Sequence, residues 1–235
     1  MAGELTLEPG HVHVWRTSVT LGQARLVELT GTLALDELSR ARRFVFDKDR
    51  ERYIASRGLL RALLGRYTGA DPQGIEFAYG PQGKPALRRP ACGLQFNVSH
   101  SGTMALFAFS ASLELGIDIE KIRPPPTDMG IARARFSALE FAALQRVPVD
   151  LRPEAFFHCW TRKEAFVKAV GGGLPFGLDR FDVTLDPGKP VALLNCRWDP
   201  LEAGRWSLID MNPAPGYAGA LAVKDAGIRV SRFNL

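Results

Sequence analysis

The sequence predicts an α+β fold in which two similar halves pack about a pseudo-two-fold axis. Strand-like and helix-like patterns occur in both parts of the chain. An arginine-rich segment, a helix and a glycine stop follow one another from Arg40 to Gly69 and again from Arg133 to Gly173. Gly83-Lys84-Pro85 returns 105 residues later as Gly188-Lys189-Pro190. Chance similarity is the competing explanation for this weak repeat.

The first half combines strands with one long helix. Its strands are predicted at residues 11–15, 75–79, 94–98 and 104–109. A short helix opens at Leu35, and the long helix runs from Arg50 to Tyr67 and ends at Gly69. Asp47 or Asp49 is expected to cap its start. Residues 99–102 read as a tight polar turn between two strands.

The second half repeats this mixture. A strand is predicted at residues 116–122 and a helix at 128–144. That helix is expected to break near Phe136, because Ser137 and Glu140 have the spacing of a capping box. A further helix covers residues 154–170 and stops at the glycines that follow. Beyond Phe181 the pattern indicates short strands and turns.

Composition limits the class of protein. The chain has 235 residues, is 46% hydrophobic and carries a net charge of +5. No apolar run approaches the ~20 residues that span a membrane, and the acidic start Met1–Leu5 lacks the features of a signal peptide. Three isolated cysteines favour reduced thiols, so we expect a cytoplasmic protein. His158 and Cys159 point in different directions on a helix, which argues against a nucleophile and base pair.

Two segments carry the candidate chemistry. In Gly116–Glu120, Asp118 and Glu120 share one face of a strand. In Trp160–Lys168, Glu164 and Lys168 share one face of a helix. If strand and helix meet, three carboxylates converge beside one ammonium, and such oxygen ligands suit Mg²⁺. The alternatives are a solvated strand face and a surface ion pair that contributes about 0.3–0.5 kcal/mol.

Together with Phe96–Gly102, these segments resemble the 4′-phosphopantetheinyl transferases, in particular the single-chain surfactin-type branch. The likeness runs from about Leu35 to Leu185. It implies a pseudo-dimer of two α/β halves with the active site in the cleft between them. Residues 1–112 would contact the phosphates and adenine of coenzyme A, and residues 113–235 would supply the metal site and the catalytic helix.

The resemblance implies that the 4′-phosphopantetheine arm of coenzyme A moves to a serine of an apo acyl or peptidyl carrier protein, releasing adenosine 3′,5′-bisphosphate. Asp118, Glu120 and Glu164 would hold Mg²⁺, with Mn²⁺ as an alternative in vitro. The catalytic residues would be Glu164, Lys168 and Asp118. Glu164 would accept the serine proton, directly or through a metal-bound water, and Lys168 would stabilise or protonate the departing phosphate.

The same resemblance places coenzyme A contacts. The residues implied are Arg40, Arg52, Lys84, Ser99, His100 and Lys168, with Tyr53 beside the adenine. The chain departs from the family pattern one turn before Arg40, where the family has a further basic residue and this chain has Asp36 and Glu37. The 3′-phosphate could therefore be bound by Arg42, Arg43 or Arg50 instead.

Other functions fit parts of the pattern. A Mg²⁺-dependent nucleotide pyrophosphate hydrolase could use the same carboxylates, and a non-catalytic module could bind coenzyme A or a carrier protein. The basic charge could attract nucleic acid, but no interleaved aromatic pattern supports that. We expect a monomer that does not bind nucleic acid or membranes.

Three apolar residues and two lysines allow two interpretations each. Phe136, Phe141 and Leu144 could form a docking patch for a carrier protein, but core packing of an amphipathic helix is the favoured interpretation. Lys121 and Lys163 are expected to be surface lysines and are left out of the catalytic set.

Overall fold

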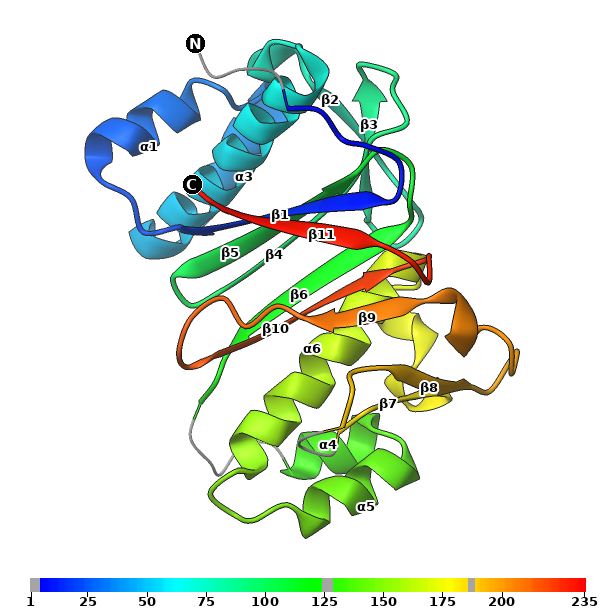
Figure 1. Ribbon diagram of the computed structural model, residues 1–235. Coiled ribbons are helices and arrows are strands. Elements are labelled where there is room, and N and C mark those ends of the chain that lie inside the picture. The colour runs from blue at the N-terminus through cyan, green and yellow to red at the C-terminus, as the bar shows by residue number, and fades with distance from the viewer. Residues whose placement is uncertain (1–4, 124–128, 186–188) are drawn as a thin grey trace.

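The computed structural model describes residues 5–123, 129–185 and 189–235, and its described residues form a mixed α/β fold (Figure 1). One sheet has the strand order β11-β1-β5-β4 and a second has the order β6-β10-β9. The strands of the first sheet are Arg229–Asn234 (β11), His11–Ser18 (β1), Met104–Ser110 (β5) and Gln95–Ser101 (β4). Those of the second are Leu115–Lys121 (β6), Tyr217–Val223 (β10) and Ser207–Asp210 (β9).

Helices and two hairpins complete the described chain. Between β1 and β4 lie α1 (Gln23–Thr30), α2 (Leu35–Ala41), α3 (Asp47–Thr68) and the hairpin of β2 (Glu76–Tyr79) and β3 (Pro85–Arg89). Between β6 and β9 lie α4 (Met129–Arg135), α5 (Ala138–Arg146), α6 (Arg152–Val170) and the hairpin of β7 (Phe181–Val183) and β8 (Leu193–Cys196). None of the described helices is both long and apolar enough to cross a membrane.

The order of elements is the same on both sides of residue 112. In each half a strand is followed by three helices, a two-stranded hairpin and two strands. The pairing also matches, because β1-β5-β4 and β6-β10-β9 are both antiparallel in the same order. One strand departs from this division: β11, from the C-terminal end, runs parallel to β1 from His11 opposite Arg229 to Arg16 opposite Asn234.

Glycines end the two long helices where the sequence predicts. Gly69 after α3 has φ 68° and Gly171 after α6 has φ 69°. A residue with a side chain is disfavoured in this left-handed conformation, so glycine can end the helix without backbone strain. The predicted acidic cap of α3 is wrong, because the helix begins at Asp47 and the residue before it, Phe46, makes no side-chain cap.

The predicted break at Phe136 is confirmed, because α4 ends at Arg135 and α5 begins at Ala138. The Ser137 hydroxyl accepts the backbone N–H of Glu140 at 3.2 Å, and the Glu140 carboxylate accepts the N–H of Ser137 at 2.9 Å. These bonds satisfy helix N–H groups that have no partner within the helix. The predicted start of α4, Asp128, lies outside the described residues.

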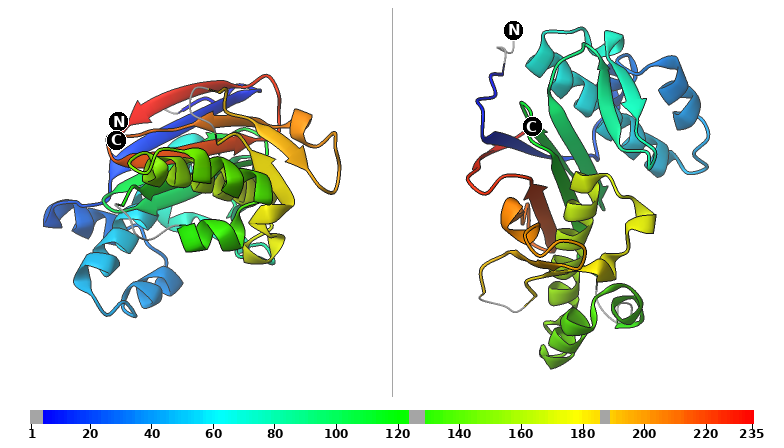
Figure 2. Two further views of the ribbon diagram at one scale, coloured as in Figure 1. Left: turned by 90° about the horizontal axis from the view of Figure 1, so that it is seen from below. Right: turned by 90° about the vertical axis from the view of Figure 1, so that its right-hand side faces the viewer.

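Each half has its own apolar core, and a third cluster joins them. In the first half α3 packs on one face of the sheet, and in the second half α6 packs on β6 and β10 (Figures 1 and 2). The joining cluster contains Val12 and Leu106 from the first sheet and Ile117, Ile119 and Leu221 from the second. Full burial of such side chains stabilises by about 1.5–3 kcal/mol each, so this layer holds the halves together.

Two interpretations of single residues are settled by burial. Phe136 and Leu144 lie in the core of the second half, and the partly buried Phe141 packs against it, so core packing is the interpretation that the structure favours. Lys121 is exposed as expected, but Lys163 is fully buried, so its assignment to the surface is wrong.

Candidate active site

The site forms where α6 packs directly on β6. Gly116 makes this close approach possible, because a Cβ atom there would collide with the carbonyl oxygen of Ala165 and the backbone nitrogen of Ala169. Ala165 and Ala169 flank Glu164 and Lys168 along α6. The missing side chain at position 116 therefore brings the acid and the ammonium of the helix against the acidic strand.

Asp118 is the buried centre of the site, with a side chain only 5% exposed. Its Oδ1 atom accepts hydrogen bonds from Lys168 Nζ at 2.6 Å and from the hydroxyl of Ser99 at 2.8 Å. Its Oδ2 atom is buried and has no hydrogen-bond partner among the residues that the structure describes. A buried carboxylate oxygen without a partner is costly, so this atom marks a place for a cation or a donor group.

Glu120 and Glu164 share the electrostatic environment of Asp118. Burial raises the pKa of Glu120, the Ser101 hydroxyl opposes this by donating a hydrogen bond at 2.7 Å, and the charge of Asp118 raises it further. Burial also raises the pKa of Glu164, and the charges of Asp118 and Glu120 add to that effect. Asp118 and Glu120 lie on β6 and Glu164 lies on α6, which packs on that strand, so the three carboxylates belong to one region of the fold.

The three carboxylates do not form a ready-made metal site in this conformation. Within the described ranges, no group of three His, Cys, Asp or Glu side chains is arranged to hold an ion. The Lys168 ammonium instead neutralises Asp118. The donor set nevertheless fits a hard divalent cation, since it offers mutually repelling carboxylates and one buried oxygen without a partner.

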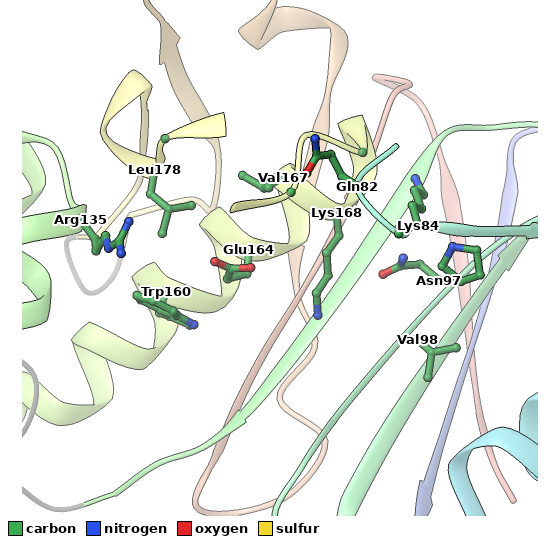
Figure 3. Close-up of a pocket in the computed structure, with 15 residues that line it drawn as sticks. Gln82, Lys84, Asn97, Val98, Arg135, Trp160, Glu164, Val167, Lys168 and Leu178 are labelled. Atoms are coloured by element: carbon green, nitrogen blue, oxygen red, sulfur yellow. The ribbon is translucent and has the colours of Figure 1, made fainter. Parts of the chain in front are cut away.

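A pocket of about 420 Å³ opens beside this centre (Figure 3). Glu164 and Lys168 lie in its middle, with Trp160 and Arg135 towards one end and Lys84 and Asn97 towards the other. Further lining residues are Gln82, Gly83, Pro85, Val98, Val167, Gly171, Gly173, Gly177 and Leu178. The pocket therefore combines apolar walls with a few charged groups, as small-molecule sites do.

Five of the six predicted coenzyme A contacts lie in the first half, and two of these, Lys84 and Ser99, come close to the candidate site. Lys84 lines the pocket, and its Nζ donates to the carbonyl oxygens of Ala169 at 2.7 Å and Leu115 at 3.1 Å. Desolvation lowers the pKa of Lys84. Ser99 contacts Asp118 and Lys168 and lies on β4, so the predicted polar turn at 99–102 is wrong for residues 99–101. The turn begins at Gly102, which has φ 58°.

His100 projects from the exposed end of β4. Although solvent reaches the side chain, the surrounding protein lowers its pKa, and the charges of Lys168 and Arg52 lower it further. The effect of those charges places Arg52 and Lys168 near the imidazole. Arg52 also contacts Asp49 at 3.7 Å. Positive charges that lower the pKa of a histidine in this way also favour an anion nearby.

Arg40 and its neighbours lie apart from the pocket. The Arg40 guanidinium stands 5.5 Å from the centre of the Tyr53 ring, and it lines a surface depression with Arg43 and Phe44. Arg42 is exposed, and Arg50 pairs with Asp47 at 2.7 Å. None of these residues lines the pocket beside Glu164.

The structure explains the acidic residue one turn before Arg40. Glu37 is buried and pairs with Arg57 and Arg61, both on α3. The Arg61 Nε atom donates to Glu37 at 2.6 Å, and the backbone N–H of Ala34 donates at 2.9 Å. Glu37 therefore anchors α2 to α3, where a basic side chain would leave Arg57 and Arg61 without their counter-charge.

Sequence reasoning missed the roles of Asn97 and Ser101. Both lie on the same face of β4 as Ser99, and their side chains reach the edge of β6. The signal available in the sequence was that polar residues recur at every second position in both segments. These are Asn97, Ser99 and Ser101 on one strand and Asp118 and Glu120 on the other. It could be interpreted only once the two strands were known to be neighbours.

Comparisons with known proteins agree with this geometry. The family described as 4′-phosphopantetheinyl transferase superfamily matches residues 114–222, and the family 4′-phosphopantetheinyl transferase, N-terminal matches residues 21–112. The 4′-phosphopantetheinyl transferase HetI of Nostoc sp. (strain PCC 7120) is 37% identical over 225 residues, which cover 95% of this chain and 92% of the relative. The 4′-phosphopantetheinyl transferase Sfp of Bacillus subtilis (strain 168) is 34% identical over 158 residues, covering 67% and 69%.

The matches to transferase families extend over both halves of the chain and agree with an enzyme that transfers a chemical group. The chain belongs to the 4′-phosphopantetheinyl transferase superfamily.

Proposed function

We propose that this protein transfers the 4′-phosphopantetheine arm of coenzyme A to a serine of an apo carrier protein in a Mg²⁺-dependent reaction. The observation that carries the proposal is the meeting of Asp118, Glu120, Glu164 and Lys168 beside a pocket, in a member of this superfamily. Adenosine 3′,5′-bisphosphate is the second product.

The reaction breaks one P–O bond of the pyrophosphate and forms another. The serine oxygen attacks the phosphorus that bears the pantetheine arm, and the bridging oxygen leaves with the adenosine bisphosphate. Glu164 takes the serine proton, a role that its raised pKa supports because a more basic carboxylate holds a proton better. Lys168 lies one turn further along α6, where its ammonium can stabilise or protonate the leaving phosphate.

Asp118, Glu120 and Glu164 would hold the divalent ion. A bound Mg²⁺ neutralises the pyrophosphate and orients it for attack. Binding of the ion would also relieve the repulsion among the three carboxylates, and it would supply a partner for the Oδ2 atom of Asp118. Lys168, which pairs with Asp118, also lines the pocket, where its ammonium can meet a phosphate group.

We further propose that the molecule is a pseudo-dimer whose ligand binds between the halves. The matching element order and strand order support a pseudo-two-fold relation. The pocket supports the shared site, because Lys84 and Asn97 come from the first half and Glu164 and Lys168 from the second. One chain thus supplies both sides of the site, so a monomer is sufficient.

The basic groups of the first half are proposed to hold the phosphates. The charges of Arg52, and of Lys168 from the second half, both act on His100, and Ser99 bridges Asp118 and Lys168. Arg40 would reach the 3′-phosphate from the surface depression beside Tyr53. Lys84 would lie near the adenine while holding the two carbonyl groups already described.

The first test replaces the proposed base. Glu164→Gln should reduce phosphopantetheine transfer by about 10²-fold or more, because the amide cannot accept the serine proton. The assay mixes protein, Mg²⁺, coenzyme A and a panel of apo carrier proteins and weighs the carriers by mass spectrometry. Glu154→Gln, an exposed position on the same helix, is the matched control and should keep full activity. Unchanged activity of Glu164→Gln would remove this residue from the mechanism.

The same assay separates the rival functions. A pyrophosphate hydrolase would release free 4′-phosphopantetheine from coenzyme A without any carrier. A binding module would retain coenzyme A but leave every carrier mass unchanged. Failure to modify any carrier in the panel would overturn the proposed transfer.

A further inference from the structure

The two sheets meet at β4 and β6 through side chains rather than through a backbone ladder. Neither strand pairs with the other in a sheet, yet three successive inward N–H groups of β6 bond to β4 side chains. Ile117 N–H donates to Asn97 Oδ1 at 2.9 Å, and Ile119 N–H donates to Ser99 Oγ at 3.3 Å. Lys121 N–H donates to Ser101 Oγ at 3.1 Å. These three residues, Asn97, Ser99 and Ser101, form what we call the β4 clasp.

Two members of the β4 clasp also hold the carboxylates. The Ser99 hydroxyl donates to Asp118 at 2.8 Å, and the Ser101 hydroxyl donates to Glu120 at 2.7 Å. Each hydroxyl thus accepts the backbone N–H of one residue of β6 and donates its own proton to the carboxylate of the preceding residue in that strand. A hydroxyl has one proton to donate and two lone pairs that accept, so a serine can make both bonds at once.

We propose that Ser101 is a positioning residue for the transfer reaction, and that its hydroxyl fixes Glu120 for the divalent ion by joining the acid to the opposite half. This inference rests on the proposed function. Ser99 has a similar place beside Asp118, where its hydroxyl also contacts Lys168. Asn97 differs from both serines, because its Oδ1 bonds only the backbone of β6.

The geometry gives Ser101 an effect on the metal site that simple packing would not have. Without the hydroxyl, Glu120 loses the hydrogen bond that Ser101 donates and Lys121 loses the acceptor of its N–H. The carboxylate then turns more freely, and the edge of β6 separates from β4 at this point. Groups that orient metal ligands typically contribute 10–100-fold to metal affinity.

The test compares two side chains of the same shape. Ser101→Thr keeps the hydroxyl, and Ser101→Val replaces it with a methyl group. Mn²⁺ binding is measured by the loss of the free-ion signal in electron paramagnetic resonance, without coenzyme A or carrier. We expect Ser101→Thr to bind Mn²⁺ within about twofold of the natural protein and Ser101→Val to bind it about tenfold more weakly.

Double variants test whether the Ser101 hydroxyl changes Mn²⁺ affinity through Glu120. With Glu120→Gln already present, the Thr and Val variants should bind Mn²⁺ equally, because the partner of the hydroxyl has changed. Ser207→Thr and Ser207→Val form the matched control, since Ser207 lies on β9 and its hydroxyl donates to the backbone carbonyl oxygen of Asp225. That pair should not differ in Mn²⁺ affinity. Ser101→Ala, which adds no bulk, is compared with the natural protein if the branched variants do not fold.

The outcomes separate this inference from the proposed function. If the natural protein binds Mn²⁺ and Ser101→Val binds it equally well, Ser101 does not position the site and the inference is overturned. Weak binding by both Ser101→Thr and Ser101→Val would also overturn it, since bulk rather than the hydroxyl would then be responsible. No Mn²⁺ binding by the natural protein would overturn the metal site itself, and with it both proposals.

Discussion

At the scale of single residues, Lys163 shows how burial changes the meaning of a motif. It precedes Glu164 on α6 but points away from the candidate site into the core of the second half. Its Nζ atom contacts Glu140 at 2.8 Å and donates to the carbonyl oxygens of Leu178 and Phe181, both at 2.6 Å. Every donor of the ammonium thus has a partner, so this lysine ties α6 to α5 and to β7.

We therefore predict that Lys163→Met reduces the free energy of unfolding by about 3–5 kcal/mol, because Glu140 is left as a buried charge without its partner. Urea denaturation monitored by circular dichroism measures this value. Lys121→Met, at an exposed position, is the control and should change stability by less than about 0.5 kcal/mol. Equal midpoints for the two variants would contradict the assigned role of Lys163.

The site residues could be predicted only in part from the sequence. The spacing of Asp118 and Glu120, and that of Glu164 and Lys168, indicated a shared face for each pair. That the two faces meet depends on Gly116, whose importance is visible only when α6 is placed on β6. The contact of Lys168 with Asp118 joins positions fifty residues apart, and no local pattern specifies such a distance.

At the scale of elements, the packing of α6 on β6 depends on the absence of a single methyl group. Gly116→Ala should force the helix away from the strand, which lowers stability by about 1–3 kcal/mol or more. It should also reduce transfer activity, because Glu164 and Lys168 move away from Asp118. Thermal unfolding and the carrier assay measure the two effects.

Gly74→Ala is the control for this change, because a Cβ atom at position 74 meets no other atom within 4 Å. That variant should unfold near the temperature of the natural protein and keep its activity. If Gly116→Ala behaved in the same way, the close packing of helix and strand would not be required.

The contact between α2 and α3 should make stability depend on pH. Burial alone would raise the pKa of Glu37, but hydrogen bonds from Arg61 and Ala34 and the charge of Arg57 outweigh it and lower the pKa below its ordinary value. A lowered pKa in the folded state stabilises the protein above the unfolded pKa of about 4.3. This stabilisation is lost as the pH falls through the folded-state pKa.

Glu37→Gln should therefore be less stable than the natural protein at pH 7 by about 1.5–3 kcal/mol. The difference should narrow as the pH is lowered below 4, where the natural carboxylate becomes protonated. Urea midpoints between pH 7 and pH 3 test this. Glu51→Gln, exposed on α3, should show no such convergence. A constant gap across this range would mean that Glu37 acts through packing alone.

At the scale of the whole molecule, the end of the chain closes the first sheet. The Phe233 ring of β11 stacks on Trp15 of β1 with centroids 4.5 Å apart, and it also meets His13 edge-on at 5.0 Å. His11 bonds Ser231 at 2.9 Å. The last strand thus belongs to the second half in sequence and to the first half in space.

Phe233→Ala should destabilise the protein by roughly 1–3 kcal/mol, less than a fully buried phenylalanine, because the ring is only partly covered. Tryptophan fluorescence during urea unfolding reports the change and should also shift in the native state. Phe46→Ala is the control, since that ring is 63% exposed. Similar stabilities for the two variants would mean that β11 contributes little to joining the halves.

The sequence by itself determined most elements, the glycine stops of the long helices, the capping box at Ser137 and the two pairs of candidate site residues. These features depend on side-chain period and backbone preference, which act over a few residues. Tertiary structure alone decided the burial of Lys163, the anchoring role of Glu37 and the β4 clasp. Each of these depends on which distant segment lies alongside, and that is set by the packing of the two halves rather than by any local pattern.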